Sequence, residues 1–240
     1  MRKIQFVRGN FYHIYNRGTD KRSIFQDDED RWRFLQGLFL FNDSGEITTT
    51  LWDIKSVFGK VNFNTIRAFM KDHQRVPITK ILSDCLMPNH FHLLVEETKE
   101  NGISRFMQKF GTGYTMYFNK KYERSGGLFS GPFKAVMIDS QEQLEYILAY
   151  INVLNPAQLV EPNLKKIGIN NLEKILDFVE KYLWSTHREY LGLRESVIIE
   201  KSGPAEIFNN PKKYLDFITD VLNGKKVIPP NYLFDEKDSE

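Results

Sequence analysis

Several features are scarce in this sequence, and each scarcity removes a class of protein. The 240 residues include a single cysteine, Cys85, which excludes an intramolecular disulfide and favours a reducing compartment. No apolar run is long enough to cross a membrane, and the first residues lack the apolar core of a secretion signal. We therefore expect a cytoplasmic protein that does not insert into membranes.

The net charge is also small. Thirty-three basic and 31 acidic side chains leave a formal charge of +2, so overall charge does not indicate a nucleic-acid partner. A local basic patch would have to carry that signal. Hydrophobic residues make up 41% of the chain and aromatic residues 14%, which is enough for a sizeable core. The length suits one elaborated domain or a domain with an appendage.

Two histidines stand one residue apart in an apolar, strand-like run at residues 87–96. Residues i and i+2 of a strand point to the same face, so His90 and His92 would project together. Neutral imidazole is the commonest metal ligand in proteins, and such a pair suits a divalent cation. The alternative is that both histidines are ordinary hydrogen-bonded parts of a sheet. His13, in an earlier strand, is a third candidate ligand, although a structural role is the commoner one for such a histidine.

Periodicity predicts an α+β fold. Alternating apolar residues indicate strands at 11–17, 78–86, 90–97 and 135–139, with the short link at Pro88-Asn89 making two of them antiparallel neighbours. Helical spacing indicates helices from residues 27–28, and over 102–122, 140–154, 171–184 and near 211–222. We expect an antiparallel sheet of four or five strands packed with helices, with the histidine pair on a central strand.

A segment rich in basic and aromatic residues follows the histidine pair, between residues 114 and 134. Cations meet phosphates and aromatic rings stack on bases, so this mixture suits single-stranded nucleic acid. The alternative is an amphipathic helix with a solvated basic face. The candidate DNA-binding residues are Arg17, Tyr117, Lys120, Lys121, Arg124 and Lys134.

Four motifs in a fixed order resemble a known family. They are Tyr12-His13-Ile14-Tyr15-Asn16-Arg17-Gly18, Leu86-Met87-Pro88-Asn89-His90-Phe91-His92-Leu93, the run 114–134, and Tyr150-Ile151 leading to Asn155-Pro156. The chain resembles the single-tyrosine HUH transposases of small insertion sequences, in which U is a hydrophobic residue, and particularly their REP-associated branch. The resemblance implies a ferredoxin-like HUH core, metal-dependent endonuclease and strand-transfer activity on single-stranded or hairpin DNA, and Mg²⁺ or Mn²⁺ as cofactor. The family includes monomers and swapped homodimers, and the sequence does not choose between them.

The resemblance makes Tyr150 the nucleophile, because it follows the last predicted strand at the family's spacing. A tyrosine hydroxyl, with a pKa of about 10, is a weak nucleophile, so the phosphate must be made more electrophilic. A divalent ion held by His90 and His92 could polarise a phosphate oxygen, and attack would leave a 5′-phosphotyrosine and a free 3′-hydroxyl. Tyr146, one helical turn earlier, is the competitor.

One position departs from the family pattern. The family places asparagine or glutamine four residues after the tyrosine, where it can complete the metal site, but this chain has Leu154. Asn155 is one residue too far for a regular α-helix. A π-bulge before Pro156 would bring it into line, and such bulges favour functional sites. We therefore predict Asn155 as the third ligand, with Asn152 or no third ligand as alternatives.

Two other functions remain open at the level of sequence. One is a replication initiator or relaxase that uses both tyrosines. The other is a catalytically inactive protein that binds single-stranded or hairpin DNA, which the leucine at position 154 would explain. For domain organisation we expect a catalytic domain at 1–160, with an insertion around 42–77. A helical extension at 161–240 would end in a disordered acidic tail.

Overall fold

A computed structural model describes residues 4–45, 51–72, 74–201, 206 and 208–225. The predicted acidic tail lies outside these residues. Four strands form one sheet in the order β2-β3-β1-β4 with every pair antiparallel. The strands are β1 (Phe11–Arg17), β2 (Thr79–Met87), β3 (His90–Glu97) and β4 (Lys134–Ile138). All four predicted strands are therefore confirmed within one or two residues.

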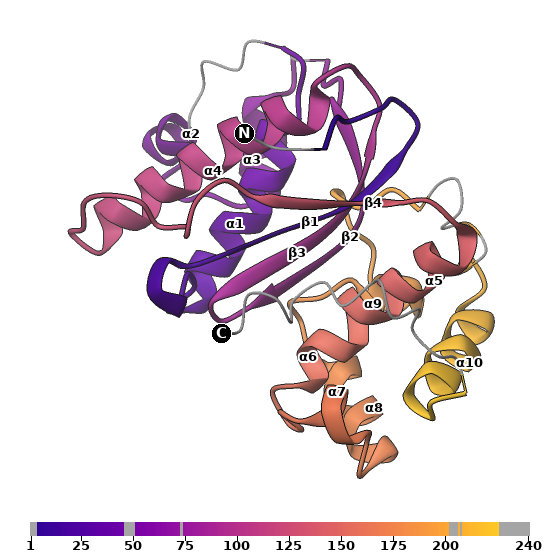
Figure 1. Ribbon diagram of the computed structural model, residues 1–240. Helices are drawn as coiled ribbons and strands as arrows, with labels where there is room; N and C mark the ends of the chain where they lie inside the picture. Colours follow the sequence, from indigo (N-terminus) through magenta and orange to yellow (C-terminus); the bar gives the residue numbers. More distant parts are fainter. Residues whose placement is uncertain (1–3, 46–50, 73, 202–205, 207, 226–240) are drawn as a thin grey trace.

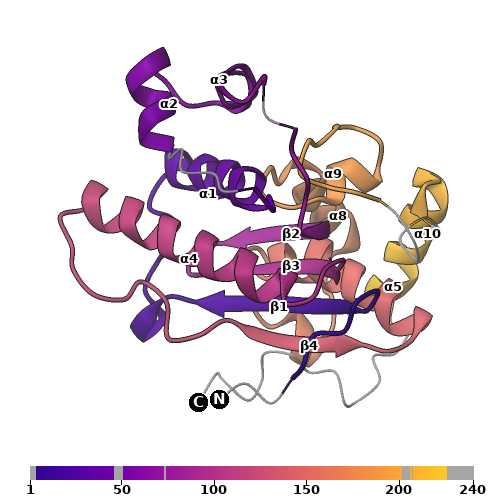
Figure 2. The same cartoon turned by 90° about the horizontal axis from the view of Figure 1, so that it is seen from above.

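Helices cover the two faces of the sheet in two separate groups (Figures 1 and 2). The first face carries α1 (Asp28–Phe41) and α4 (Gly102–Lys121), with α2 (Leu51–Phe58) and α3 (Phe63–Phe69) outside α1. With the strands, α1 and α4 complete a β-α-β-β-α-β chain order, which is the ferredoxin-like connectivity. The predicted α+β class is thereby confirmed.

The second face carries the helices that follow β4. These are α5 (Gln141–Ala149), a π-helical turn η2 (Tyr150–Leu154), α6 (Asn155–Ala157), α7 (Leu164–Ile167), α8 (Leu172–Lys181), α9 (His187–Tyr190) and α10 (Pro211–Leu222). A short 3₁₀ turn, η1 (Thr19–Lys21), follows β1 on the other side. Within the described part of the chain, every helix is too short or too polar to span a bilayer.

Local sequence signals explain where several helices begin. Asp27 caps α1 by accepting from the Asp30 N–H, and Ser140 caps α5 by accepting from the Gln143 N–H. The Gln143 side chain reaches one residue further back than in a capping box, because its Oε1 accepts from the Asp139 N–H at 2.7 Å. Each of these caps fixes the direction in which the helix leaves the sheet.

Residues beyond 160 pack into the same core rather than forming a separate appendage. Ser185 forms an antiparallel bridge with Cys85 on β2, and the Tyr190 hydroxyl donates to the Leu82 carbonyl at 3.0 Å. Tyr190 and the α10 side chains belong to the apolar cluster that also contains Tyr150. The proposed extension is helical, as expected, but it contributes structurally to the face of the sheet that carries His92.

A buried acid at this junction gives a pH-dependent prediction. Asp84 on β2 is buried, and desolvation and the nearby Glu189 raise its pKa from 3.8 to about 7, while Arg194 opposes the rise. The folded state therefore holds this proton longer than the unfolded state, so stability falls as pH rises from about 4 to 7. We expect Asp84→Asn to be more stable than the wild type at pH 8, by about 3 kcal/mol.

The measurement is denaturant unfolding at pH 4 and pH 8, with Asp177→Asn as the matched control. Asp177 is exposed on α8 and pairs with Lys181, so its substitution should change stability little at either pH. A loss of stability in Asp84→Asn at pH 8 would show that the carboxylate is required in its charged form.

Candidate metal and tyrosine site

The pairing register of β1 and β3 gathers the predicted histidines on one face of the sheet. Tyr15 pairs with His92, and Arg17 pairs with His90. Paired residues on neighbouring strands point to the same side, so all four side chains lie on the face that is covered by α5 and η2. Lys134 on β4 pairs with Tyr15 and joins this face at its edge. As predicted, the histidine pair occupies a central strand.

His92 is held by a second histidine. Its Nδ1 lies 2.8 Å from Nε2 of His13, both side chains are fully buried, and their rings stack with centroids 5.1 Å apart. Only one proton can lie between these two nitrogens. If His92 coordinates a metal through Nε2, its proton must be on Nδ1 and His13 must accept it. In that arrangement His13 would position His92, and whether it does so stays a prediction.

His90 has a comparable partner. Its Nδ1 lies 2.7 Å from the Oδ1 of Asn89, in the two-residue turn between β2 and β3. An amide oxygen only accepts, so this contact places the proton of neutral His90 on Nδ1 and leaves Nε2 as the coordinating nitrogen. The His90 ring stands edge-on to His92 with centroids 5.0 Å apart, and His90 is half-buried. The exposed side of the site is therefore the His90 side.

Tyr150 lies beside the buried histidines. Its ring centroid is 5.6 Å from that of His92 and 5.9 Å from that of His13, both in edge-to-face geometry. The tyrosine is only 4% exposed. The structure therefore brings together His90, His92 and Tyr150, which the sequence analysis selected from positions up to 60 residues apart.

Tyr146 lies one turn earlier on the same helix. Its ring is 6.4 Å from that of Tyr150, and burial raises the pKa of its hydroxyl well above the ordinary value of 10. Desolvation without a compensating cation makes the phenolate harder to form. Tyr150 is the tyrosine that packs edge-on against His92 and His13, and its role as the reactive side chain stays a prediction.

The helix changes pitch at Tyr150, as the departure at Leu154 predicted. Residues 150–154 form a π-helical turn, in which the Asn155 N–H donates to the Tyr150 carbonyl. This i→i+5 bond places Asn155 one full turn after Tyr150, on the position that Leu154 would take in a regular α-helix. Asn155 is fully buried, and its Oδ1 accepts from Gln158 Nε2 at 3.2 Å. The role of Asn155 as a ligand stays a prediction.

Asn152, the alternative third ligand, has a different role. Its Oδ1 accepts from the hydroxyls of Ser83 and Thr186, both at 2.7 Å, and its Nδ2 donates to the Tyr214 hydroxyl at 3.1 Å. The same tyrosine oxygen lies 2.9 Å from His187 Nδ1, and burial lowers the pKa of His187 to about 4. This buried neutral network ties η2 to β2 and α10, and it leaves no lone pair of the Asn152 amide oxygen for a metal.

The donor set suits a divalent cation of moderate affinity. Two imidazole nitrogens and one amide oxygen are available if Asn155 contributes, and all three are neutral ligands. Within the described part of the chain, no group of three histidine, cysteine or acidic side chains is arranged to hold a metal ion. These three ligands would leave part of the coordination sphere of a divalent ion open to other oxygen ligands.

Two of the predicted DNA-binding residues are engaged inside the protein. The Tyr117 hydroxyl donates to Asp30 at 2.9 Å, and its ring is buried against α1. Lys121 Nζ forms ion pairs with Asp27, Glu29 and Asp30 at 2.8–3.1 Å. Both side chains secure α4 to the start of α1, which speaks against a role in DNA contact.

The other four predicted DNA-binding residues lie at the surface in two places. Arg17 and Lys134 lie on the histidine face of the sheet, where a bound phosphate would meet them. Lys120 lies on the opposite side of the molecule with its Nζ 3.8 Å above the Trp52 ring, and Arg124 donates to the Asn119 side chain at 2.7 Å. A DNA role for these four stays a prediction.

His13 contributes more to this site than its sequence context indicates. A lone strand histidine carries no signal of its own partner, because the pairing register decides which side chain it faces. The signal that could have indicated this role is the alternation of side chains along β1. His13 and Tyr15 lie on the same face of the strand, and Tyr15 pairs with His92. That register follows only once β1 and β3 are known to be neighbours.

Comparison with known proteins agrees with this geometry. The family model described as "Transposase IS200 like" matches residues 53–153, a segment that contains His90, His92, Tyr146 and Tyr150 and ends before Asn155. Among curated proteins, none matches this chain. A solved structure of a REP-associated tyrosine transposase bound to a REP hairpin is similar, with a TM-score of 0.47 and 11% identity over 85% of this chain and 98% of that one.

The family match covers less than half of the chain. Over residues 53–153 this chain is similar to the IS200-like transposases, which confirms the resemblance seen in its motifs. The match begins inside α2, in the part predicted to be an insertion, and it includes β2, β3, α4, β4 and α5.

Proposed function

We propose that this protein is a DNA transposase that cleaves and rejoins single-stranded DNA through a covalent bond to Tyr150. The observation that carries the proposal is the packing of Tyr150 against the His92–His13 pair, at the turn where the helix changes to π-helical pitch. The side chains proposed as nucleophile, metal ligand and positioning residue therefore lie in contact on one face of the sheet, which supports the proposal.

The chemistry requires one bond to form and one to break. The Tyr150 Oη attacks the phosphorus and loses its proton, the bond from phosphorus to the 3′ oxygen breaks, and that oxygen takes up a proton. A 5′-phosphotyrosine and a free 3′-hydroxyl result, and the reverse reaction with another 3′-hydroxyl completes strand transfer. When bound by His90, His92 and Asn155, Mg²⁺ or Mn²⁺ would draw charge from the phosphate and make the phosphorus more electrophilic.

The residues of the chain would supply position and charge. His13 and Asn89 hold the two histidines with Nε2 available, and the i→i+5 bond aligns Asn155 with Tyr150. Arg17 and Lys134, on the same face, can meet the phosphates that flank the cleaved bond. Because Tyr150 and His92 are buried, DNA reaches them only if side chains around the half-exposed His90 move, which a flexible single strand allows more readily than a duplex.

The test is covalent capture of DNA. Labelled single-stranded oligonucleotides from the DNA flanking the gene are incubated with the protein and Mg²⁺ or Mn²⁺, then resolved on a denaturing gel. The proposal expects a protein–DNA adduct whose labelled peptide contains Tyr150, and no adduct with the same sequence as a duplex. DNA binding without any adduct would support the inactive-binder alternative instead.

A further inference from the structure

A cavity lies on the side of the molecule away from Tyr150. It has a volume of about 800 Å³ and is lined by α1, α2, α3 and the loop between α2 and α3, with Tyr117 of α4 at one side. We name it the α1–α3 pocket. Because α1 covers the face of the sheet opposite to α5 and η2, this pocket cannot be part of the tyrosine site (Figure 2).

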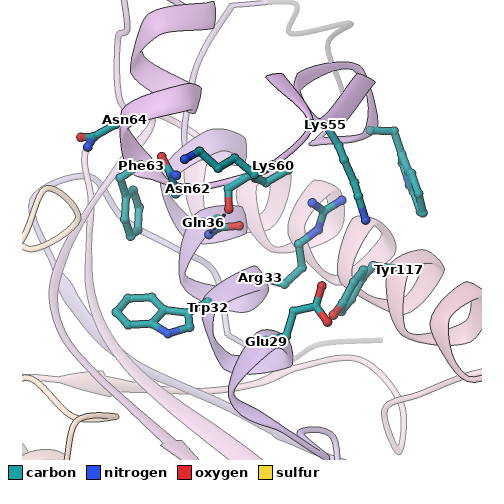
Figure 3. A pocket seen from close by; sticks show the side chains of 13 residues that line it. Glu29, Trp32, Arg33, Gln36, Lys55, Lys60, Asn62, Phe63, Asn64 and Tyr117 are labelled. Carbon is teal, nitrogen blue, oxygen red and sulfur yellow. Dashed lines mark hydrogen bonds between the residues drawn. The ribbon is translucent and has the colours of Figure 1, made fainter. Parts of the chain in front are cut away.

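Aromatic rings are unusually open at this pocket. Trp32 of α1 is 44% exposed and Trp52 of α2 is 43% exposed, although tryptophan is a large apolar side chain that normally packs in a core. Figure 3 shows Trp32 below Phe63 on one side of the pocket. Such flat, accessible rings are the surface on which a nucleobase stacks.

Positive charge lies at the opposite side of the same pocket. The Arg33 guanidinium lies 5.0 Å from the Tyr117 ring centroid, and Lys55 reaches from α2 toward both of them (Figure 3). Burial lowers the pKa of Arg33 to about 10, so it is still a cation at neutral pH. Lys60 adds a third positive charge to the lining, and Lys120 lies next to it on Trp52.

One carboxylate, that of Glu29, lines the pocket, and its Oε2 is 3.1 Å from the ammonium of Lys121, which also pairs with Asp27 and Asp30. Because Arg33, Lys55 and Lys60 outnumber Glu29 in the lining, the pocket carries net positive charge, although the chain as a whole carries only +2. A concentrated positive field beside exposed rings selects a ligand that is both anionic and aromatic.

We infer that the α1–α3 pocket binds one nucleotide of a single-stranded DNA, with the phosphate at Arg33 and Lys55 and the base against Trp32. An acidic peptide would satisfy the cations and leave the rings exposed, so the combination favours a nucleotide. The cavity volume is in the range of pockets that enclose small ligands. The inference rests on the proposed function for its partner, and it adds a contact to DNA that flanks the cleaved bond.

The test compares binding of two oligonucleotides that contain the cleavage position, one short and one extended on both sides. Trp32→Leu should weaken binding of the extended strand about tenfold, because one stacked base is lost, and Trp32→Phe should keep most of the affinity. Lys55→Gln should reduce the slope of log affinity against log salt by about 0.7, the value for one phosphate contact on a single strand. Binding of the short strand and its adduct yield should not change.

Lys212→Gln is the matched control, because Lys212 is an exposed helix lysine on α10, on the other side of the sheet. Circular dichroism confirms that each variant is folded. Extended-strand affinity of Trp32→Leu and Lys55→Gln equal to that of Lys212→Gln would overturn the inference while leaving an adduct, and thus the proposed function, intact. The reverse pattern, with pocket-dependent binding and no adduct, would support the pocket and contradict the transposase chemistry.

Discussion

Tyr150→Phe is expected to abolish the covalent protein–DNA adduct while leaving DNA binding within about twofold of the wild type. Phenylalanine keeps the ring that packs against His92 and His13, so the local structure is preserved. It removes the only atom that can form the phosphotyrosine bond. Loss of a covalent nucleophile commonly costs several orders of magnitude in rate, here at least about a thousandfold. The measurement is adduct yield on a denaturing gel beside anisotropy of the same labelled strand.

Tyr146→Phe is the matched control, since it removes the same hydroxyl one turn earlier on the same helix. Its adduct yield should stay close to that of the wild type, because Tyr150 is the tyrosine that packs edge-on against His92 and His13, and burial raises the pKa of the Tyr146 hydroxyl. An adduct that survives Tyr150→Phe and disappears with Tyr146→Phe would reverse the assignment. Partial loss in both variants would indicate the two-tyrosine chemistry of replication initiators.

Much of the fold follows from local signals in the sequence. The strands could be predicted because apolar and polar residues alternate along them. The starts of α1 and α5 could be predicted because acidic or hydroxyl side chains cap their first turns. The π-helical turn at 150–154 could be predicted for a different reason. A leucine where a polar residue is required, followed at once by Asn155 and Pro156, implied one extra residue in the turn.

Tertiary contacts could not be predicted from local patterns in the sequence. Lys121 and Tyr117 stand in a basic-aromatic run that suits DNA, but Asp30 of α1 lies beside them and accepts from both. No local pattern indicates that an acidic first turn, which suits the helix dipole, will also face the end of α4. The same limit applies to Asn152, whose partners Thr186 and Tyr214 come from residues read only as a helical extension.

His92→Ala is expected to remove most metal affinity, by at least about a hundredfold, because imidazole is the strongest ligand type in this donor set. The readout is Mn²⁺ binding by calorimetry, together with the stabilisation that Mn²⁺ gives in thermal unfolding, which scales with the logarithm of metal concentration over the dissociation constant. Adduct formation should disappear in parallel, and a chelator should have the same effect on the wild type. A metal affinity unchanged in both His92→Ala and His90→Ala would place the ion elsewhere.

Substitutions at His13 separate a positioning residue from a packing residue. Loss of a hydrogen-bond partner to a metal-ligating histidine typically costs 10–100-fold in affinity, so His13→Phe should weaken Mn²⁺ binding by about that factor. His13→Gln places an amide oxygen near the position of Nε2, where it can accept from His92 Nδ1–H, and should restore most of the affinity. A structural role in packing would predict the opposite order, because phenylalanine fills the buried space better than glutamine.

Nitrogen NMR of the metal-free protein gives a readout that does not depend on activity. The positioning role requires that the proton of neutral His92 in the wild type reside on Nδ1 and point to His13 Nε2, which lies 2.8 Å away. In His13→Phe that acceptor is gone, so the proton should be shared between both ring nitrogens, and each molecule with the proton on Nε2 cannot bind metal through that atom. A His92 tautomer that is unchanged in His13→Phe would mean that something other than His13 holds the ring. His13 would then be only a packing residue.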